Sequence, residues 1–295
     1  MATEVVEKRV KAGQGLETLK LAGQITPRAV VGSDDPKVPT PELRDFFEPQ
    51  LRAKEHIERR ADVKLAVMAF MLYHIGLVGW VLYNSGSTPA LLWKLGALLC
   101  ATYGSDLFTG FLHIYLDHRR CDLGDPLDMA AYSFRYDHHA YPGNFNKDNV
   151  FLPAGSGEIV AFIATPVSIL MHSFVYASGG LVHDSTSELK ALCLCVWIVT
   201  GGACQMTHSL AHEGISGRNK SCPNLIRFLQ KSHIILPPMT HGGHHKGDHD
   251  CNFCIFNGWA NPLLNTIKPA VFWAMRKCPG HFDIRAVPGG RPKVD

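Results

Sequence analysis

The sequence predicts an all-α membrane protein with four transmembrane helices. Two observations support this prediction. Four long runs of residues contain almost no charged side chains, and each run has about the length of a membrane-spanning helix. The 16 histidines are also unevenly distributed, because 13 of them fall between His113 and His249. The predicted architecture is therefore a helical bundle with a histidine-rich cap on one face of the membrane.

The first 61 residues differ in composition from the rest of the chain. They hold 21 of the 55 Asp, Glu, Lys and Arg residues, ten acidic and eleven basic. We expect residues 1–61 to form a polar cytosolic tail with a short charged helix over 42–60. The ten acidic residues argue against an organellar transit peptide, and no apolar stretch of useful length precedes Leu65, which argues against a signal peptide. A net charge of +3 is too small to indicate a nucleic-acid partner.

The apolar runs come next in the chain. Residues 65–83 contain no Asp, Glu, Lys or Arg, and nineteen helical residues span roughly 29 Å, close to the thickness of the hydrocarbon layer. A single run of this kind can be the buried core helix of a soluble protein, but four in one chain favour a membrane protein. We expect helices at 63–84, 89–114, 159–180 and 189–212. They would lie in a transmembrane domain of residues 62–275, followed by a carboxy-terminal tail of residues 276–295.

The connections between the runs predict the orientation. The linkers 84–88 and 181–189 contain no Lys or Arg, whereas basic residues precede the first run, occupy the segment 113–158 and follow the fourth run. By the positive-inside rule, both termini and the segment 113–158 face the cytosol. The chain is thus predicted to be multi-pass, with its histidine clusters on the cytosolic face.

Four histidine clusters lie on this predicted face. They are HIYLDH (113–118), FRYDHHAYP (134–142), THSLAHE (207–213) and THGGHHKGDHDCNFC (240–254). Neutral imidazole is a ligand for zinc, iron, copper and nickel. A tetrahedral zinc site would use only three or four of these side chains. The number of histidines therefore predicts a cap that holds two transition-metal ions with nearly all-histidine ligands.

Helical spacing gives some of these residues a common direction. His208 and His212 are four residues apart, and so are His113 and Asp117, so each pair shares a helix face. His118 would point about 140° away from His113 on a regular helix, and would reach that face only if the helix ended before it. Asp106 lies two turns before His113, and we expect its carboxylate to orient that imidazole. The alternative for Asp106 is a polar residue that faces water at a helix end.

The position of the clusters narrows the reaction. A metal pair at a membrane face is placed to act on a lipid chain, whose C–H bonds are too inert for acid–base groups. Iron with dioxygen can remove hydrogen from such bonds. The sequence contains no GxSxG motif, no P-loop and no GxGxxG after a strand, so serine hydrolysis and nucleotide binding have no support.

The same segments resemble a known family. DLFTGFLHIYLD (106–117), FRYDHHAYP, THSLAHE and HIILPPMTHGGHHKGDHDCNFCIFNGWAN (233–261) are similar, in order and spacing, to the transmembrane lipid desaturases. The best-known members are plasmanylethanolamine desaturases and a plastid phosphatidylglycerol desaturase. The resemblance covers about residues 60–275. It implies an integral membrane oxidoreductase with two iron ions held by histidine boxes and with O2 as co-substrate.

The resemblance also implies the metal ligands, and no catalytic residue beyond them. The chain departs from the plasmanylethanolamine enzymes at Thr240-His241, where these typically have two adjacent histidines, so the role of His241 is open. His233 matches a family histidine that is either a ligand or a supporting residue. Asp117 matches an acidic position of the first motif, which favours Asp117 over His118 as the residue near the metal. The implied ligand set is His113, Asp117, His138, His139, His208, His212, His241, His244, His245 and His249.

The details of the sequence favour one substrate within the family. His249 and the FCI…GW ending look more like the plasmanylethanolamine enzymes, which convert a 1-O-alkyl lipid to a vinyl ether. The resemblance then implies a membrane phospholipid substrate, a cytochrome b5-type electron donor and the endoplasmic reticulum membrane. The alternative within the family is desaturation of an acyl chain of phosphatidylglycerol.

Two other classes remain as alternatives. A metal transporter would place ionisable residues deep within its spans, whereas these histidines cluster beyond the span ends. A zinc-dependent membrane hydrolase would need a glutamate base beside the metal, and Glu213 next to His212 is the nearest candidate. Metal content separates the three classes.

Overall fold

The structure is a computed structural model that describes residues 38–58, 61–83, 87–125, 127–139, 185–215, 224–246 and 249–289. Within these ranges all regular elements are helical, and the one β-bridge joins Arg119 to Phe282. The predicted all-α class is therefore confirmed for the described residues. The expected helix at 159–180 lies outside them.

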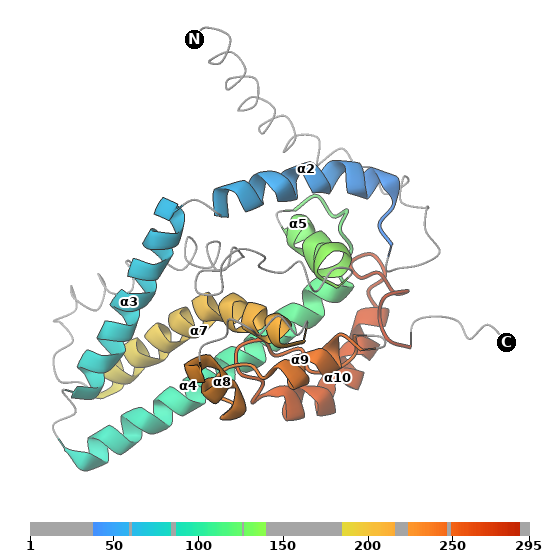
Figure 1. Cartoon of the computed structure of the whole chain (residues 1–295). Coiled ribbons are helices and arrows are strands. Elements are labelled where there is room, and N and C mark those ends of the chain that lie inside the picture. The colour runs from blue at the N-terminus through green and yellow to red at the C-terminus, as the bar shows by residue number, and fades with distance from the viewer. Residues whose placement is uncertain are drawn as a thin grey trace, which may run out of the picture. The chain divides into compact units, whose positions relative to one another are not determined.

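The chain divides into two compact units. The first contains residues 1–52, 115–140 and 270–295, and the second contains residues 53–114 and 141–269. Three of the helices labelled in Figure 1 contribute residues to both units: α2 (Pro41–Glu58), α4 (Thr88–His118) and α10 (Asn261–Arg276).

The second unit holds the predicted apolar helices. Three of the four expected helices are present as α3 (Ala61–Tyr83), α4 and α7 (Ser185–Ile215). The segments Pro89–His118 and Leu189–Glu213 are long and apolar enough to cross a membrane, while α3 contributes a shorter apolar segment, Met71–Tyr83.

Large apolar side chains on these helices point outward. Leu72 and Trp80 of α3 are each 60% exposed, and Leu92 and Trp93 of α4 are 63% and 76% exposed. Water would penalise this arrangement, whereas a lipid environment favours it. A set of four membrane spans remains a proposal.

Apolar and polar contacts together hold α3, α4 and α7 against one another. Val81, Ala101, Leu192 and Val196 form a buried cluster to which all three helices contribute. The Lys94 ammonium donates to the Val81 carbonyl oxygen at 2.9 Å and so satisfies one of the free carbonyls at the end of α3. This contact explains how a buried lysine is tolerated near the start of an apolar run.

Helices α4 and α7 run in the same direction. The hydroxyls of Ser105 and Thr200 are hydrogen-bonded, and further along both helices the ring centroids of His113 and His208 are 5.8 Å apart. Residue numbers thus rise together along the two helices. The prediction that the second and fourth runs end on the same face requires this orientation.

Among its described residues, the second unit also contains three shorter helical segments: α8 (Asn224–Lys231), α9 (Pro238–His244) and the beginning of α10. Helix α9 starts at a proline, which has no N–H to leave unsatisfied at a helix beginning. Gly243 lies where a Cβ atom would be 2.9 Å from the Asn252 side-chain nitrogen, so glycine leaves room for that amide without a shift of its side chain.

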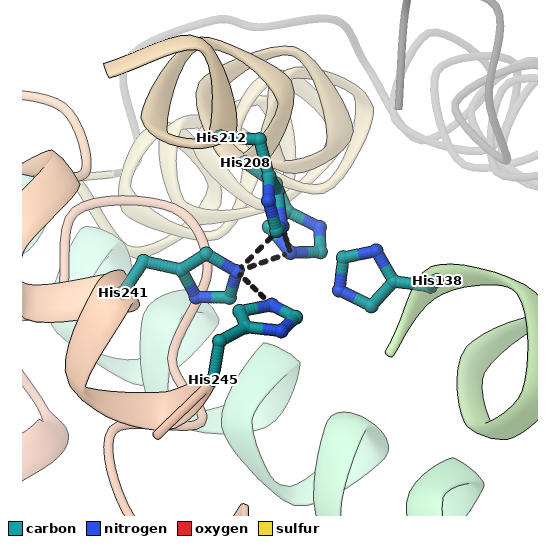
Figure 2. Close-up of side chains that lie close together, drawn as sticks. All are labelled: His138, His208, His212, His241 and His245. Carbon is teal, nitrogen blue, oxygen red and sulfur yellow. Dashed lines mark hydrogen bonds between the residues drawn. The ribbon is translucent and has the colours of Figure 1, made fainter. Parts of the chain in front are cut away.

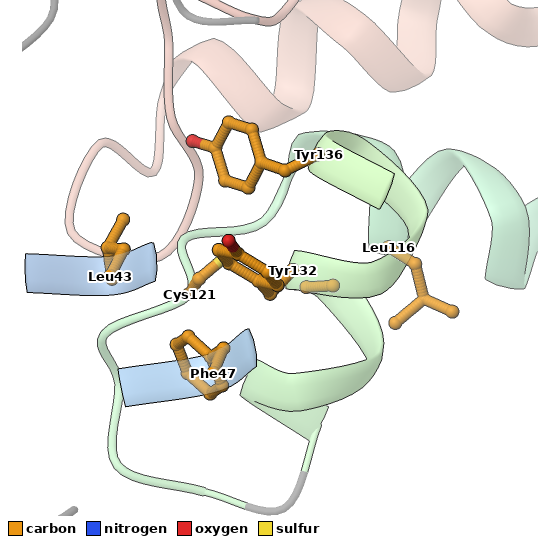
Figure 3. Packing of buried hydrophobic residues seen from close by; sticks show 7 residues of the cluster. Leu43, Phe47, Leu116, Cys121, Tyr132 and Tyr136 are labelled. Carbon is orange, nitrogen blue, oxygen red and sulfur yellow. The ribbon is translucent and has the colours of Figure 1, made fainter. Parts of the chain in front are cut away.

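The first unit is built around a small apolar core, shown in Figure 3. Aromatic rings from α2 and α5 (Leu127–Tyr132) stack there, with the centroids of Phe47 and Tyr132 4.9 Å apart. The helix expected at 42–60 is confirmed as α2, which follows Thr40, whose hydroxyl accepts from the Leu43 N–H. The buried members of the core are Leu43, Phe47, Leu116, Cys121, Ala131, Tyr132 and Tyr136.

The residues after α10 belong to this first unit as well. The Asp283 N–H donates to the His118 carbonyl at 2.9 Å, and the Arg120 N–H donates to the His281 carbonyl at 3.0 Å. The segment 277–289, expected in a carboxy-terminal tail, thus pairs with the residues that end α4.

Candidate metal centre

Four imidazoles converge in the second unit, as Figure 2 shows. His208 and His212 project from one face of α7, as their spacing predicts, and His241 and His245 come from α9 and the residue after it. Their Nε2 atoms are separated by 2.7 Å (His208–His241), 2.9 Å (His212–His241), 3.1 Å (His241–His245) and 3.3 Å (His208–His212). His138, also drawn in Figure 2, belongs to the first unit.

These separations match those of nitrogens around a metal ion. With imidazole–metal bonds of about 2.1 Å, two ligand nitrogens lie about 3.0 Å apart at a right angle and about 3.4 Å apart at the tetrahedral angle. A hydrogen-bonded network explains the arrangement less well, because a neutral imidazole carries only one N–H. The donor set therefore fits a transition-metal ion.

Burial keeps these side chains in the form that binds metals. His241 is fully buried, and burial, with the neighbouring His208, lowers its pKa well below the ordinary value. Burial, with a smaller contribution from His249, lowers the pKa of His245 to about 4. A neutral imidazole offers a lone pair, whereas a protonated one offers none. At neutral pH these imidazoles are therefore uncharged and able to bind a cation.

Backbone carbonyls orient two further histidines. The Nδ1 atom of His113 lies 2.9 Å from the Phe253 carbonyl oxygen, and that of His244 lies 2.9 Å from the Cys251 carbonyl oxygen. Each Nδ1–H donates to its carbonyl, which leaves the Nε2 lone pair as the metal-binding position. The ring centroids of His113 and His244 are 4.6 Å apart, so the second unit holds a second pair of histidines placed to bind a metal.

Asp106 has a different role from the one expected. It does not orient His113, whose Nδ1 lies on the Phe253 carbonyl. Its buried carboxylate instead accepts backbone N–H groups of the loop that precedes α10, at 3.0–3.3 Å. A negative charge is also favourable at the beginning of a helix. The backbone donors to this carboxylate are Phe256, Asn257, Gly258 and Ala260. Asp106 thus fixes the loop that follows the carbonyls of Cys251 and Phe253.

Two histidines have a left-handed backbone: His233, which precedes the fourth cluster, and His249 within it. The ring of His249 is centred 5.6 Å from that of His244 and 5.7 Å from that of His245, so it borders the centre. His233 is exposed and belongs to neither group of side chains that could hold a metal.

The remaining predicted site residues belong to the first unit. Asp117 and His139 are 3.5 Å apart, and the rings of His138 and His139 are centred 5.3 Å apart. His138 ends the π-helix η1 (Ser133–His138), an element that is frequent at functional sites. His118 is buried with its ring centred 5.2 Å from Phe272 of α10. This contact gives His118 a packing role within the unit.

Sequence reasoning missed the groups that support the ligands. The carbonyls of Cys251 and Phe253 carry no side-chain signal, so only their folded position shows their role. Asn252 between them is held by Asn265 of α10, whose side chain both accepts from the Asn252 N–H and donates to its side-chain oxygen, each at 3.0 Å. The two asparagines fix the loop by which His113 and His244 are oriented.

The fold and the site define a class: a helical protein with membrane-type helices and a buried histidine cluster that could hold a metal ion. Comparison with known families identifies the family. A lipid desaturase domain matches residues 102–278, more than half of the chain. The chain therefore belongs to the lipid desaturase family, and the apolar helices together with this membership indicate a membrane-bound oxidoreductase that acts on lipid.

Two relatives illustrate the family. A plasmanylethanolamine desaturase of Myxococcus xanthus is 27% identical over 252 residues, which cover 83% of this chain and 80% of the relative. A chloroplastic fatty acid desaturase 4-like 1 of Arabidopsis thaliana is 26% identical over 186 residues, which cover 61% of this chain and 56% of the relative. No solved structure matches the chain.

Proposed function

We propose that this protein is a di-iron, O2-dependent desaturase that converts the 1-O-alkyl chain of plasmanylethanolamine to a vinyl ether. The observation that carries the proposal is the convergence of the four imidazole nitrogens of His208, His212, His241 and His245. The substrate is inferred from the Myxococcus relative, which aligns over most of both chains.

The proposed ligand set extends beyond the second unit. Two ions with nearly all-histidine ligands need more nitrogens than one cluster of four supplies. The supporting observations are the pairing of Asp117 with His139 and the position of His249 beside the centre. We assign the ligands as His113, Asp117, His138, His139, His208, His212, His241, His244, His245 and His249.

The reaction removes one hydrogen from each of two neighbouring carbons of the alkyl chain. When bound, iron with dioxygen supplies an oxidant able to take hydrogen from an unactivated C–H bond. The two hydrogens, two electrons from a donor and two protons reduce one O2 to two water molecules. A C=C bond next to the ether oxygen is the product.

The side chains of this protein hold and orient the centre. His113 and His244 each give their Nδ1–H to a carbonyl and keep Nε2 for the metal. Burial of His241 and His244 excludes water that would otherwise compete for the metal and quench reactive species. The side chains of the protein thus contribute positioning and the exclusion of water, whereas iron and dioxygen, when bound, would supply the oxidation.

The charge pattern supports the orientation of the chain, and the family resemblance supports its membrane. We assign both termini to the cytosol and the chain to the endoplasmic reticulum membrane as a multi-pass protein. The basic cytosolic face suits docking of an acidic electron donor of the cytochrome b5 type. An acyl chain of phosphatidylglycerol is the second candidate substrate, because the Arabidopsis relative is named as a fatty acid desaturase.

The test is lipid analysis of cells that lack vinyl-ether lipids and express the chain. Mass spectrometry should detect acid-labile ethanolamine lipids, and the variant His208→Ala should produce none. Appearance of an additional double bond in phosphatidylglycerol, with no vinyl ether, would replace the proposed substrate by the second candidate. If neither the 1-O-alkyl lipid nor phosphatidylglycerol is consumed, desaturation of both candidate substrates is refuted.

A further inference from the structure

A cavity outside the histidine cluster lies wholly within the first unit. Its volume is about 340 Å³, within the range of small-ligand sites, about 300 to 1,000 Å³. Apolar side chains form part of its wall, and the segment after α4, the helix η1 and the segment after α10 provide its polar wall. The polar lining includes Arg120, Asp122, Arg135, Tyr136, Asp283 and Arg285.

The lining carries more positive than negative charge. Asp283 is shared by two arginines: it accepts from Arg135 at 2.9 Å and from Arg285 at 3.1 and 3.2 Å. Arg120 is matched by Asp122 through two hydrogen bonds of 2.8 and 2.5 Å. Three guanidinium groups thus face two carboxylates. The excess of one positive charge favours an anionic ligand, and guanidinium is well suited to phosphate oxygens.

The two arginines around Asp283 differ in exposure. The Arg135 side chain is 5% exposed and also donates to the Arg119 carbonyl, so it belongs to the framework of the unit. The Arg285 side chain is 47% exposed and therefore accessible to a ligand that enters from outside. Apolar lining beside such a guanidinium suits a molecule with a phosphate and a hydrocarbon part.

The position of the cavity along the chain connects it with the reaction. Arg135 precedes the predicted ligands His138 and His139 by less than two helical turns. In a 1-O-alkyl phospholipid, the phosphorus and the first carbon of the alkyl chain are six bonds apart, which an extended chain spans in roughly 7 Å. A desaturase acting at this carbon therefore needs its phosphate site near its metal ligands.

We infer that this cavity binds the phosphodiester of the lipid substrate, with Arg285 as the residue that contacts the phosphate. The inference rests on the proposed function for the identity of the substrate. It adds a specificity site that selects glycerophospholipids over lipids without phosphate.

The test measures binding to the purified full-length protein in detergent by native mass spectrometry. The probes are dihexanoyl phosphatidylethanolamine, dihexanoylglycerol, which lacks the phosphate, and inorganic phosphate. Arg285→Gln should weaken binding of the phospholipid about fivefold or more, as expected for loss of a charge-assisted hydrogen bond. Arg285→Lys should recover part of the affinity, and binding of dihexanoylglycerol should not change.

The matched control is Arg52→Gln, the same substitution at an 80% exposed arginine of α2. It should leave phospholipid binding unchanged, and metal content should be equal in all variants. Equal phospholipid affinity in wild type and Arg285→Gln would overturn the inference, as would saturation of the site by inorganic phosphate alone. If phospholipid binding depends on Arg285 but the protein carries out no desaturation, the proposed function is refuted and the inferred binding site stands.

Discussion

The two units bury polar side chains in opposite ways. In the first unit, buried arginines are matched by carboxylates: Arg119 donates to Asp128 at 2.6 Å, and Arg135 donates to Asp283 at 2.9 Å. Hydrogen bonds from Arg285 and the charge of Arg135 outweigh burial and lower the pKa of Asp283 to about 2, so it stays ionised. These charges compensate one another, which burial requires.

The second unit contains a buried cluster whose polar groups are all of one kind. The imidazoles of His208, His212 and His241 bring their nitrogens within 3.3 Å of one another, and burial keeps His241 neutral. Clustered lone pairs repel one another until a cation binds them. The difference teaches that the buried arginines of the first unit are neutralised by partners within the protein, whereas the histidine cluster of the second unit fits a bound cation. Substitutions in these two groups should therefore have different effects.

The largest effect is expected at the centre of the histidine cluster. Loss of a residue that only supports a metal ligand lowers metal affinity roughly 10- to 100-fold. His241→Ala removes a proposed ligand itself, so it should lower bound iron and vinyl-ether product by about 100-fold or more. The measurements are elemental analysis of purified protein and lipid analysis of cells. The control is His233→Asn, at an exposed position whose left-handed backbone asparagine tolerates. Equal metal loss in both variants would contradict the assignment.

The next effect separates two neighbours at the end of α4. Asp117→Ala should abolish vinyl-ether product, because Asp117 pairs with His139 and is assigned to the centre. His118→Ala should retain much of the product, because its ring packs on Phe272, and should lower thermal stability instead. The reverse pattern of activities would transfer the metal-binding role to His118.

Substitutions in the charge network of the first unit should lower the stability of the protein and leave its metal content unchanged. Asp283→Asn leaves the buried Arg135 without its carboxylate and should lower the free energy of unfolding by about 3 kcal/mol. The thermal midpoint in detergent, compared with that of Arg52→Gln, measures the effect, since an exposed ion pair contributes about 0.5 kcal/mol or less.

The pH dependence of this contribution has a defined sign. The folded pKa of Asp283 lies below the ordinary value of about 4, so the stabilisation is fully present above about pH 4. It is lost as the pH falls toward 2. The stability difference between wild type and Asp283→Asn should therefore shrink in acid, and a difference that grows in acid would contradict the proposed ion pair.

A smaller effect is expected at the carboxylate that holds the loop before α10. Asp106→Asn keeps one acceptor oxygen but turns an amide toward backbone donors such as the Ala260 N–H. We expect a loss of about 2 kcal/mol in stability and weaker metal retention, because the loop also positions the carbonyl on His113. Unchanged thermal and chelator resistance would show that the loop does not depend on Asp106.

Local patterns explain what the sequence predicted well. The helices expected at 63–84, 89–114 and 189–212 correspond to α3, α4 and α7, because helix formation and apolar length are properties of a single segment. The spacing of His208 and His212 predicted their common direction for the same reason. The family followed from motifs that are contiguous in the chain.

Contacts between distant segments explain what the sequence could not provide. Asp106 binds a loop 150 residues away, so its spacing from His113 was misleading. Glycine has a low helix propensity, yet α9 includes both Gly242 and Gly243, and Gly243 leaves room for the side chain of Asn252. The cavity lined by arginines could not be predicted from the sequence, because charged residues in linkers are ordinarily exposed to solvent and form no recognisable motif.

The most direct measurement is the metal content of the wild-type chain, purified in detergent from cells supplied with both iron and zinc. The central claim is that the convergent histidines form the metal centre of a di-iron lipid desaturase. Elemental analysis should find two iron ions per chain. One zinc ion per chain and no iron would contradict the claim and favour a zinc-dependent membrane hydrolase.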